Sequence, residues 1–220
     1  MTANLVVISD PASPAAEAYR RLRVNLMSAG QQAPLQVLLV AAAGPDPDKS
    51  MTVANLAVTF ARVGKRVILV DCDLRHPAQH ILLGLTNDAG VTTVMDGGET
   101  AALPLQPTEI PGLRVMTSGP SVPVPSDTIA SPGMARLLAS LRQEADVVLL
   151  DAPPVVLATD AVELATQVDG VLLTVSAGRT KRDDAQRAVH LLKRVGARLV
   201  GTALVNLPVD ADQRRYLATS

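Results

Sequence analysis

The sequence predicts an α/β fold in which a doubly wound, mainly parallel sheet carries helices on both faces, within a single domain over residues 1–220. Short apolar runs alternate with longer amphipathic stretches along the chain, which is the pattern of repeated strand–helix–strand units. Hydrophobic residues form 48% of the sequence, yet it holds one Phe, two Tyr and no Trp. The core is therefore expected to consist of Ala, Val, Leu and Ile, which suit helices packed on buried parallel strands.

The first expected element is a helix in the N-terminal region 1–30. Ser13 is a good N-cap, and Pro14 fits the first helical position because its ring fixes a helical φ and its missing N–H needs no partner there. We expect this helix to end near Met27, before Gly30.

Six apolar runs predict strands that are covered on both faces, because they lack regularly alternating polar residues. They are residues 35–42, 66–70, 113–117, 147–150, 170–176 and 198–205. Amphipathic stretches between the strands predict four further helices. They are residues 50–62, 134–144, 160–167 and 181–195. Gly64 and Gly196 follow the first and the last of these four as C-caps.

Two segments carry weaker patterns. Residues 100–132 hold seven prolines, so we expect a surface connection with one strand, 113–117, rather than a domain boundary. Residues 205–220 are interpreted as a C-terminal tail.

Charge and composition exclude several classes of protein. The net charge of −1 gives no basic field to attract nucleic acid or an acidic membrane. One cysteine excludes a disulfide framework and suits a reducing cytosol. No apolar run reaches the roughly 18 residues that a membrane helix needs, and the N-terminus lacks the pattern of a signal peptide. We therefore expect a cytoplasmic protein without direct membrane insertion.

Residues able to bind Mg²⁺ or phosphate follow three of the predicted strands. Asp71 and Asp73 follow one strand, Asp151 follows another, and Lys49 and Ser50 open the helix after a third. The carboxyl ends of parallel strands meet at one edge of a sheet, so these groups should cluster. A lysine can neutralise phosphate, a Ser hydroxyl and carboxylates can hold Mg²⁺, and a helix N-terminus offers N–H donors. The pattern predicts a Mg–nucleotide site.

Several segments together resemble a known family. They are SPAAEAYRRLRVNL, RVILVDCDLRHP, VVLLDAPPVVLATDA, VPVPSDTIAS, DGVLLTV and GTALVN. Together they resemble bacterial tyrosine kinases of the polysaccharide-export type, which are cytoplasmic P-loop modules that partner a membrane chain-length regulator. The resemblance covers nearly the whole chain. It implies a P-loop NTPase type of fold, Mg-ATP or Mg-ADP as cofactor if binding is retained, a homo-oligomer, and that membrane regulator as activating partner.

The resemblance also implies roles for individual residues. Catalytic roles fall on Asp71, Asp73 and Lys49. Nucleotide binding falls on Gly44, Lys49, Ser50 and Met51, and metal binding on Ser50, Asp71 and Asp151. Glu17, Arg20 and Arg23 match the family's E-x-x-R-x-x-R motif, which is implicated in ring assembly. From spacing alone, these three residues share one helix face, for which a solvated charged surface is the ordinary interpretation.

The phosphate loop departs from the family pattern P-G-E-G-K-S, because here residues 45–50 read PDPDKS. Aspartates replace both glycines, and Pro47 removes one N–H donor. A carboxylate about 4 Å from a phosphate charge, at an effective dielectric of about 20, costs about 4 kcal/mol, or about a thousandfold in affinity. We expect Asp48 to be the main obstacle, through its charge or by pairing with Lys49, and Asp46 to point outward.

The chain also lacks the tyrosine cluster in which the family's kinases usually end. Tyr216, beside two arginines, is the possible phosphoacceptor. Tyr19 lies on the first helix and is expected to pack against the domain or a neighbouring subunit.

Three functions fit these features. The sequence favours a degenerate, pseudokinase-like module that regulates exopolysaccharide or capsule polymerisation and export through assembly. The first alternative is an active ATP-dependent tyrosine autokinase. The second is a partition ATPase of the Min or Par type, ranked last because residues 42–44 lack the lysine of that group.

Overall fold

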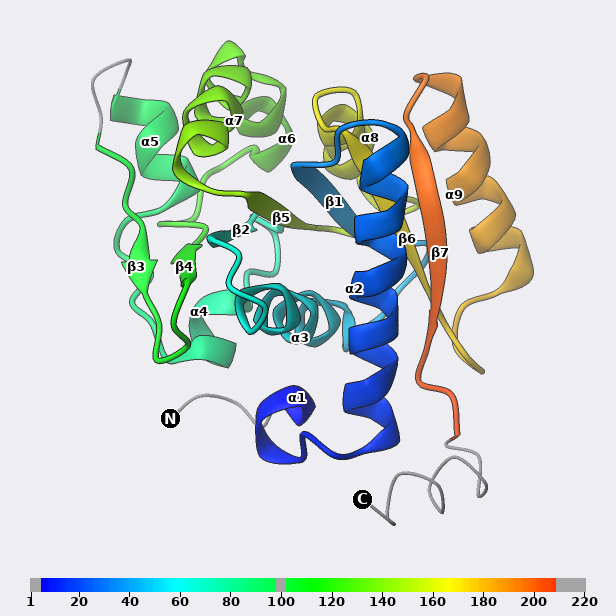
Figure 1. Cartoon of the computed structure of the whole chain (residues 1–220). Helices are drawn as coiled ribbons and strands as arrows, with labels where there is room; N and C mark the ends of the chain where they lie inside the picture. Colours follow the sequence, from blue (N-terminus) through cyan, green and yellow to red (C-terminus); the bar gives the residue numbers. More distant parts are fainter. Residues whose placement is uncertain (1–4, 98–101, 209–220) are drawn as a thin grey trace.

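The computed structural model describes residues 5–97 and 102–208. Its centre is a seven-stranded sheet in the order β3-β4-β2-β5-β1-β6-β7 (Figure 1). The strands are β1 Val37–Ala42, β2 Val67–Asp71, β3 Gln106–Pro107, β4 Leu113–Met116, β5 Val147–Ala152, β6 Gly170–Ser176 and β7 Leu199–Val205. All pairs are parallel except β3 with β4. The predicted α/β class and the positions of the six predicted strands are confirmed. The predicted coverage of residues 198–205 on both faces is wrong, because β7 lies at the edge of the sheet and its residues are partly buried or exposed.

Helices cover both faces of the sheet (Figure 1). On one face lie α1 Val6–Ser9, α2 Pro14–Gln32, α3 Lys49–Ala61 and α4 Gln79–Leu83. On the other lie α5 Val91–Gly97, α6 Pro125–Ala130, α7 Pro132–Glu144, α8 Asp160–Ala165 and α9 Arg182–Arg194. Alternate residues of β1 supply the two cores: Leu38 packs with the first group and Leu39 with the second. The buried β-branched and aliphatic runs are thus explained by burial on both sides.

The predicted end of the first helix near Met27 is wrong, because α2 continues through Gly30 to Gln32. Glycine inside a helix costs only about 1 kcal/mol relative to alanine. The helix ends where Ala33 adopts an extended conformation, with φ −155° and ψ 145°, directly before Pro34. A residue before proline is disfavoured in helical conformation, so the proline sets this end.

Five short elements were not predicted: α1, α4, α5, β3 and α6. Two of them, β3 and α6, lie in the segment 100–132, which was expected to hold one strand. Each has seven residues or fewer, too few for a periodic pattern to be distinct. None of the helices in the described ranges is both long enough and apolar enough to cross a bilayer.

Candidate nucleotide-binding site

Lys49 lies at the centre of the predicted site, at the start of α3. Its side chain is buried, and its Nζ forms an ion pair with Asp151 and lies 3.3 Å from Asp73 Oδ2. The same Nζ donates a hydrogen bond to Ser50 Oγ at 3.3 Å. Burial disfavours the charge, but the carboxylates of Asp151 and Asp73 outweigh it and raise the pKa of Lys49. The lysine predicted to hold phosphate is thus charged and held by carboxylates in this structure.

Asp71 and Asp151 are neighbours across the sheet, since they are register partners in β2 and β5. Both are fully buried. Burial, and after it the charge of Asp151, raises the pKa of Asp71 to about 7. Asp71 Oδ2 accepts hydrogen bonds from the N–H groups of Ala78 and Gln79, both at 2.9 Å. The loop after β2 is therefore folded around this carboxylate.

Gln79 is a site residue that the sequence did not reveal. Its Nε2 donates to Asp151 Oδ2 at 2.8 Å and to the carbonyl oxygen of Ser50 at 3.0 Å. A glutamine at the start of a five-residue helix has no distinctive sequence signal, so only the fold shows that it reaches the carboxylates.

Asp46 does not point outward, in contrast to the prediction, because only 9% of the residue is exposed. Its Oδ1 accepts a hydrogen bond from the N–H of Asp48 at 3.1 Å, and its carbonyl oxygen accepts from the N–H of Lys49 at 3.5 Å. Its Oδ2 is buried and has no hydrogen-bond partner within residues 5–97 and 102–208. Pro47 has no N–H, and the N–H groups of residues 48 and 49 donate to Asp46. These N–H groups are therefore not free to bind a phosphate.

Asp48 does not pair with Lys49, in contrast to one of the two predicted effects. Its Oδ2 accepts hydrogen bonds from Arg179 Nη1 at 2.8 Å and from Asn206 Nδ2 at 3.2 Å. The side chains of Asp48 and Arg179 are 48% and 53% exposed. Asp48 has φ −96° and ψ 0°, so this position does not need the left-handed freedom of glycine. The carboxylate is turned toward the ends of β6 and β7, and Asp46 is the buried charge of the loop.

The remaining loop residues predicted to bind nucleotide are placed as follows. Gly44 is buried, and a Cβ there would lie 3.3 Å from Asp184 Oδ2 at the start of α9. Met51 lies in the first turn of α3, with its side chain partly buried against the core on that face. The first N–H groups of a helix lack acceptors within it, so the backbone of Ser50 and Met51 remains suited to an anion.

Arg75, which follows the paired aspartates, is used within the fold. It forms a two-point ion pair with Asp160, at 2.9 Å from Nε to Oδ2 and 3.1 Å from Nη2 to Oδ1. Asp160 is fully buried at the start of α8. The pair ties the loop after β2 to the segment after β5, beside the carboxylates.

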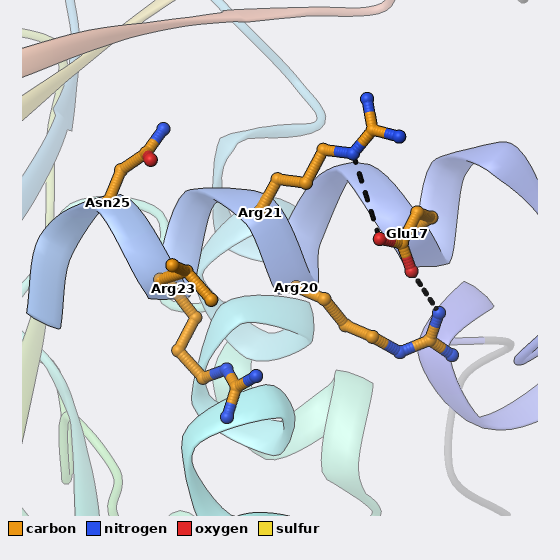
Figure 2. Close-up of a pocket in the computed structure, with 6 residues that line it drawn as sticks. Glu17, Arg20, Arg21, Arg23 and Asn25 are labelled. Atoms are coloured by element: carbon orange, nitrogen blue, oxygen red, sulfur yellow. Dashed lines mark hydrogen bonds and ion pairs between the residues drawn. The ribbon is translucent and has the colours of Figure 1, made fainter.

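On α2, the predicted assembly residues lie around one pocket (Figure 2). Glu17 pairs with Arg20 at 2.8 Å and with Arg21 at 3.6 Å. Arg23 is not part of these pairs, and its buried Nε has no hydrogen-bond partner in the part of the chain that the structure describes. Figure 2 shows Arg20 and Arg23 on the same side of the helix and Arg21 on another. Arg20 and Arg23 thus lie on one side of α2, and Glu17 pairs with Arg20 there and with Arg21 on the other side. The role of Glu17, Arg20 and Arg23 in assembly stays a prediction.

The two tyrosines differ in what can be said of them. Tyr19 packs against the core under α2, with its hydroxyl 3.5 Å from Thr52 Oγ1, and burial raises its pKa. Its predicted packing against the domain is confirmed. Tyr216 lies outside the described residues, so its predicted role as phosphoacceptor stays a prediction.

The residues present fit Mg²⁺ bound together with a nucleotide. Ser50, Asp71 and Asp151 offer the hard oxygen ligands that Mg²⁺ prefers. Within the described residues, no group of three or more His, Cys, Asp or Glu side chains is arranged to hold a metal ion unaided. Mg²⁺ usually takes one or two carboxylates and completes its shell with phosphate oxygens and water, which agrees with this arrangement.

The strand order, the Lys-Ser pair at the start of α3 and the carboxylates after β2 and β5 define a P-loop NTPase fold. The family model that matches, over residues 36–207, is of the ParA group and is described as NUBPL iron-transfer P-loop NTPase. This match supports the P-loop NTPase fold.

More specific similarities come from individual proteins. The chain is 30% identical to CapB of Staphylococcus aureus over 96% of this chain and 93% of that protein. It is 33% identical to tyrosine-protein kinase YwqD of Bacillus subtilis over 93% of this chain and 86% of that protein. The crystal structure of the chimerical protein CapA2B2 superimposes with a TM-score of 0.87 and 34% identity, over 93% of this chain and 90% of that one. The chain belongs to the bacterial tyrosine kinase family of CapB and YwqD, as the sequence motifs predicted.

Proposed function

We propose that this chain is a member of the bacterial tyrosine kinase family whose nucleotide binding is impaired and which regulates capsule or exopolysaccharide polymerisation and export. The observation that carries the proposal is the buried carboxylate of Asp46 inside the phosphate loop. It takes the N–H of Asp48 and leaves its second oxygen unpaired among the described residues. A phosphate would meet a buried negative charge where it needs N–H donors.

The impairment has a second component in Lys49. Its Nζ is held by Asp151 and Asp73, so a phosphate must remove the lysine from two carboxylates before using its charge. When bound, Mg²⁺ would offset part of this cost by neutralising phosphate and carboxylate charge. Ser50 and Asp151 are the residues we assign to hold it, with Asp71 beside them.

The alternative is an active tyrosine autokinase, and one observation favours it. The carboxyl edge of the sheet holds all the predicted catalytic and metal-binding groups: Lys49, Ser50, Asp71, Asp73 and Asp151. In that case Lys49 and Ser50 position the transferred phosphoryl group in line with a tyrosine hydroxyl. One of the aspartates in this group would accept the hydroxyl proton.

The proposed partner is a membrane chain-length regulator, supported by the likeness to the chimerical protein CapA2B2. We also propose a cytoplasmic location beside the membrane, reached through this partner, and a homo-oligomer formed through Glu17, Arg20 and Arg23. Support for the oligomer is that Arg20, paired with Glu17, and Arg23 lie on one side of α2 (Figure 2).

Titration of a fluorescent ADP analogue with Mg²⁺ tests the impairment. We expect weak or undetectable binding by the natural chain and restored binding by Asp46→Gly/Asp48→Gly. The control is Asp10→Gly/Asp88→Gly, which makes the same change in charge at two exposed positions. Equal affinity of the natural chain and the loop variant would overturn the proposal. Micromolar binding by the natural chain would favour the autokinase, with phosphorylation of Tyr216 as its next test.

A further inference from the structure

Gln79 contacts Ser50 and Asp151, the two residues that we assign to the metal, and Asp71 beside them. Its side chain donates to Asp151 Oδ2 and to the carbonyl oxygen of Ser50, and its own N–H donates to Asp71 Oδ2. The residue is completely buried. One glutamine therefore links the ends of β2 and β5 to the first turn of α3.

These contacts divide the two oxygens of Asp151 between two donors. Lys49 occupies Oδ1 and Gln79 occupies Oδ2. If Lys49 leaves for a phosphate, Gln79 still holds the carboxylate in the same orientation and Oδ1 becomes free. A carboxylate that ligates a metal is commonly fixed by such a hydrogen bond, and its loss typically lowers metal affinity about 10–100-fold.

The amide oxygen of Gln79 gives a second, independent observation. Gln79 Oε1 is buried without a hydrogen-bond partner in residues 5–97 and 102–208. An unpaired buried carbonyl costs about 1–3 kcal/mol, so a hydrogen-bond donor that reaches this oxygen would be stabilising. Mg²⁺ bound with a nucleotide keeps several waters, and these are donors of the required kind.

We propose that Gln79 is a positioning residue for the magnesium site, with Nε2 orienting Asp151 and Oε1 accepting a hydrogen bond from hydration water that Mg²⁺ brings. This role goes beyond the impaired phosphate loop. Gln79 sets how much Mg²⁺ increases nucleotide affinity, whereas the loop carboxylates weaken binding of the phosphates themselves.

The test measures ADP affinity with Mg²⁺ and with EDTA, in the Asp46→Gly/Asp48→Gly background. Gln79→Met keeps the side-chain length and removes both the donor and the acceptor. We expect it to reduce the gain from Mg²⁺ about 10–100-fold, with the affinity in EDTA changed less than about twofold. Leu83→Met, a buried control on the same helix, should keep the full gain. An unchanged gain in Gln79→Met, or equal losses with and without Mg²⁺, would overturn the proposal.

A nucleotide-free measurement checks the contact itself. In ¹H–¹⁵N spectra of the natural chain, the Gln79 side-chain amide protons should exchange slowly with solvent, and Asp151→Asn should shift them. Exchange as fast as that of an exposed glutamine would also overturn the proposal. Failure of the loop hypothesis is distinct, because it appears in the comparison between the natural chain and the loop variant, in which Gln79 is unchanged.

Discussion

Replacing the two loop aspartates one at a time separates their effects, and the structure predicts unequal results. Asp46 is 9% exposed and has a carboxylate oxygen without a partner among the described residues. A charge of this kind about 4 Å from a phosphate charge, at an effective dielectric of about 20, costs about 4 kcal/mol. Asp46→Gly should therefore strengthen ADP binding by up to about a thousandfold.

Asp48 should matter far less, because its carboxylate is half-exposed and paired with Arg179. Exposed ion pairs are typically worth about 0–1 kcal/mol, so Asp48→Gly should change ADP affinity about fivefold or less. Asp46→Asn is the matched control: it removes the charge and keeps an oxygen that can accept the N–H of residue 48. Competition titrations against a fluorescent ADP analogue measure all three. A larger gain from Asp48→Gly than from Asp46→Gly would refute this reasoning.

Three further predictions follow from the same contacts. First, burial, followed by the charge of Asp151, raises the folded-state pKa of Asp71 from 3.8 to about 7, so between those values the folded protein binds the extra proton. The contribution of Asp71 to the unfolding free energy should be fully present below pH 3.8 and should fall by about 1.4 kcal/mol per pH unit as pH rises from 3.8 to about 7. Urea denaturation at several pH values should show this slope, and its persistence in Asp71→Asn would contradict the assignment. Second, Lys49→Met leaves Asp73 and Asp151 buried without their cation and should lower the unfolding free energy by about 3–5 kcal/mol; an unchanged urea midpoint would argue against the buried pair. Third, Arg20→Ala/Arg23→Ala should reduce self-association in sedimentation velocity, while Arg21→Ala should not. Equal self-association of both variants would show that Arg20 and Arg23 do not mediate assembly.

Most strands could be predicted because they are buried on both faces, so that residues 37–42 or 170–176 are almost uniformly apolar. The edge strand β7 is apolar in sequence although its residues are only partly buried or exposed. The clustering of Asp71, Asp151 and Lys49 could also be predicted, since parallel strands place their carboxyl ends at one edge. Gly30 was a misleading signal for the end of α2, because the helix runs to Gln32 and is ended by Pro34, four residues after that glycine.

The orientations of the loop aspartates could not be predicted from local sequence. Asp48 is turned outward by Arg179 and Asn206, which lie 131 and 158 residues away in the chain. Gln79 was missed for a similar reason, since its partner Asp151 is 72 residues away. Long-range hydrogen bonds of this kind leave no periodicity in the sequence, so the identity of the buried charge in the loop required the fold.

Calorimetric titration of the natural chain with ADP and Mg²⁺ tests the central claim most directly. The carboxylate within the phosphate loop and the lysine held by two carboxylates predict no saturable binding below millimolar ADP. A dissociation constant in the micromolar range would contradict that claim, because it would mean that the loop admits phosphates despite Asp46.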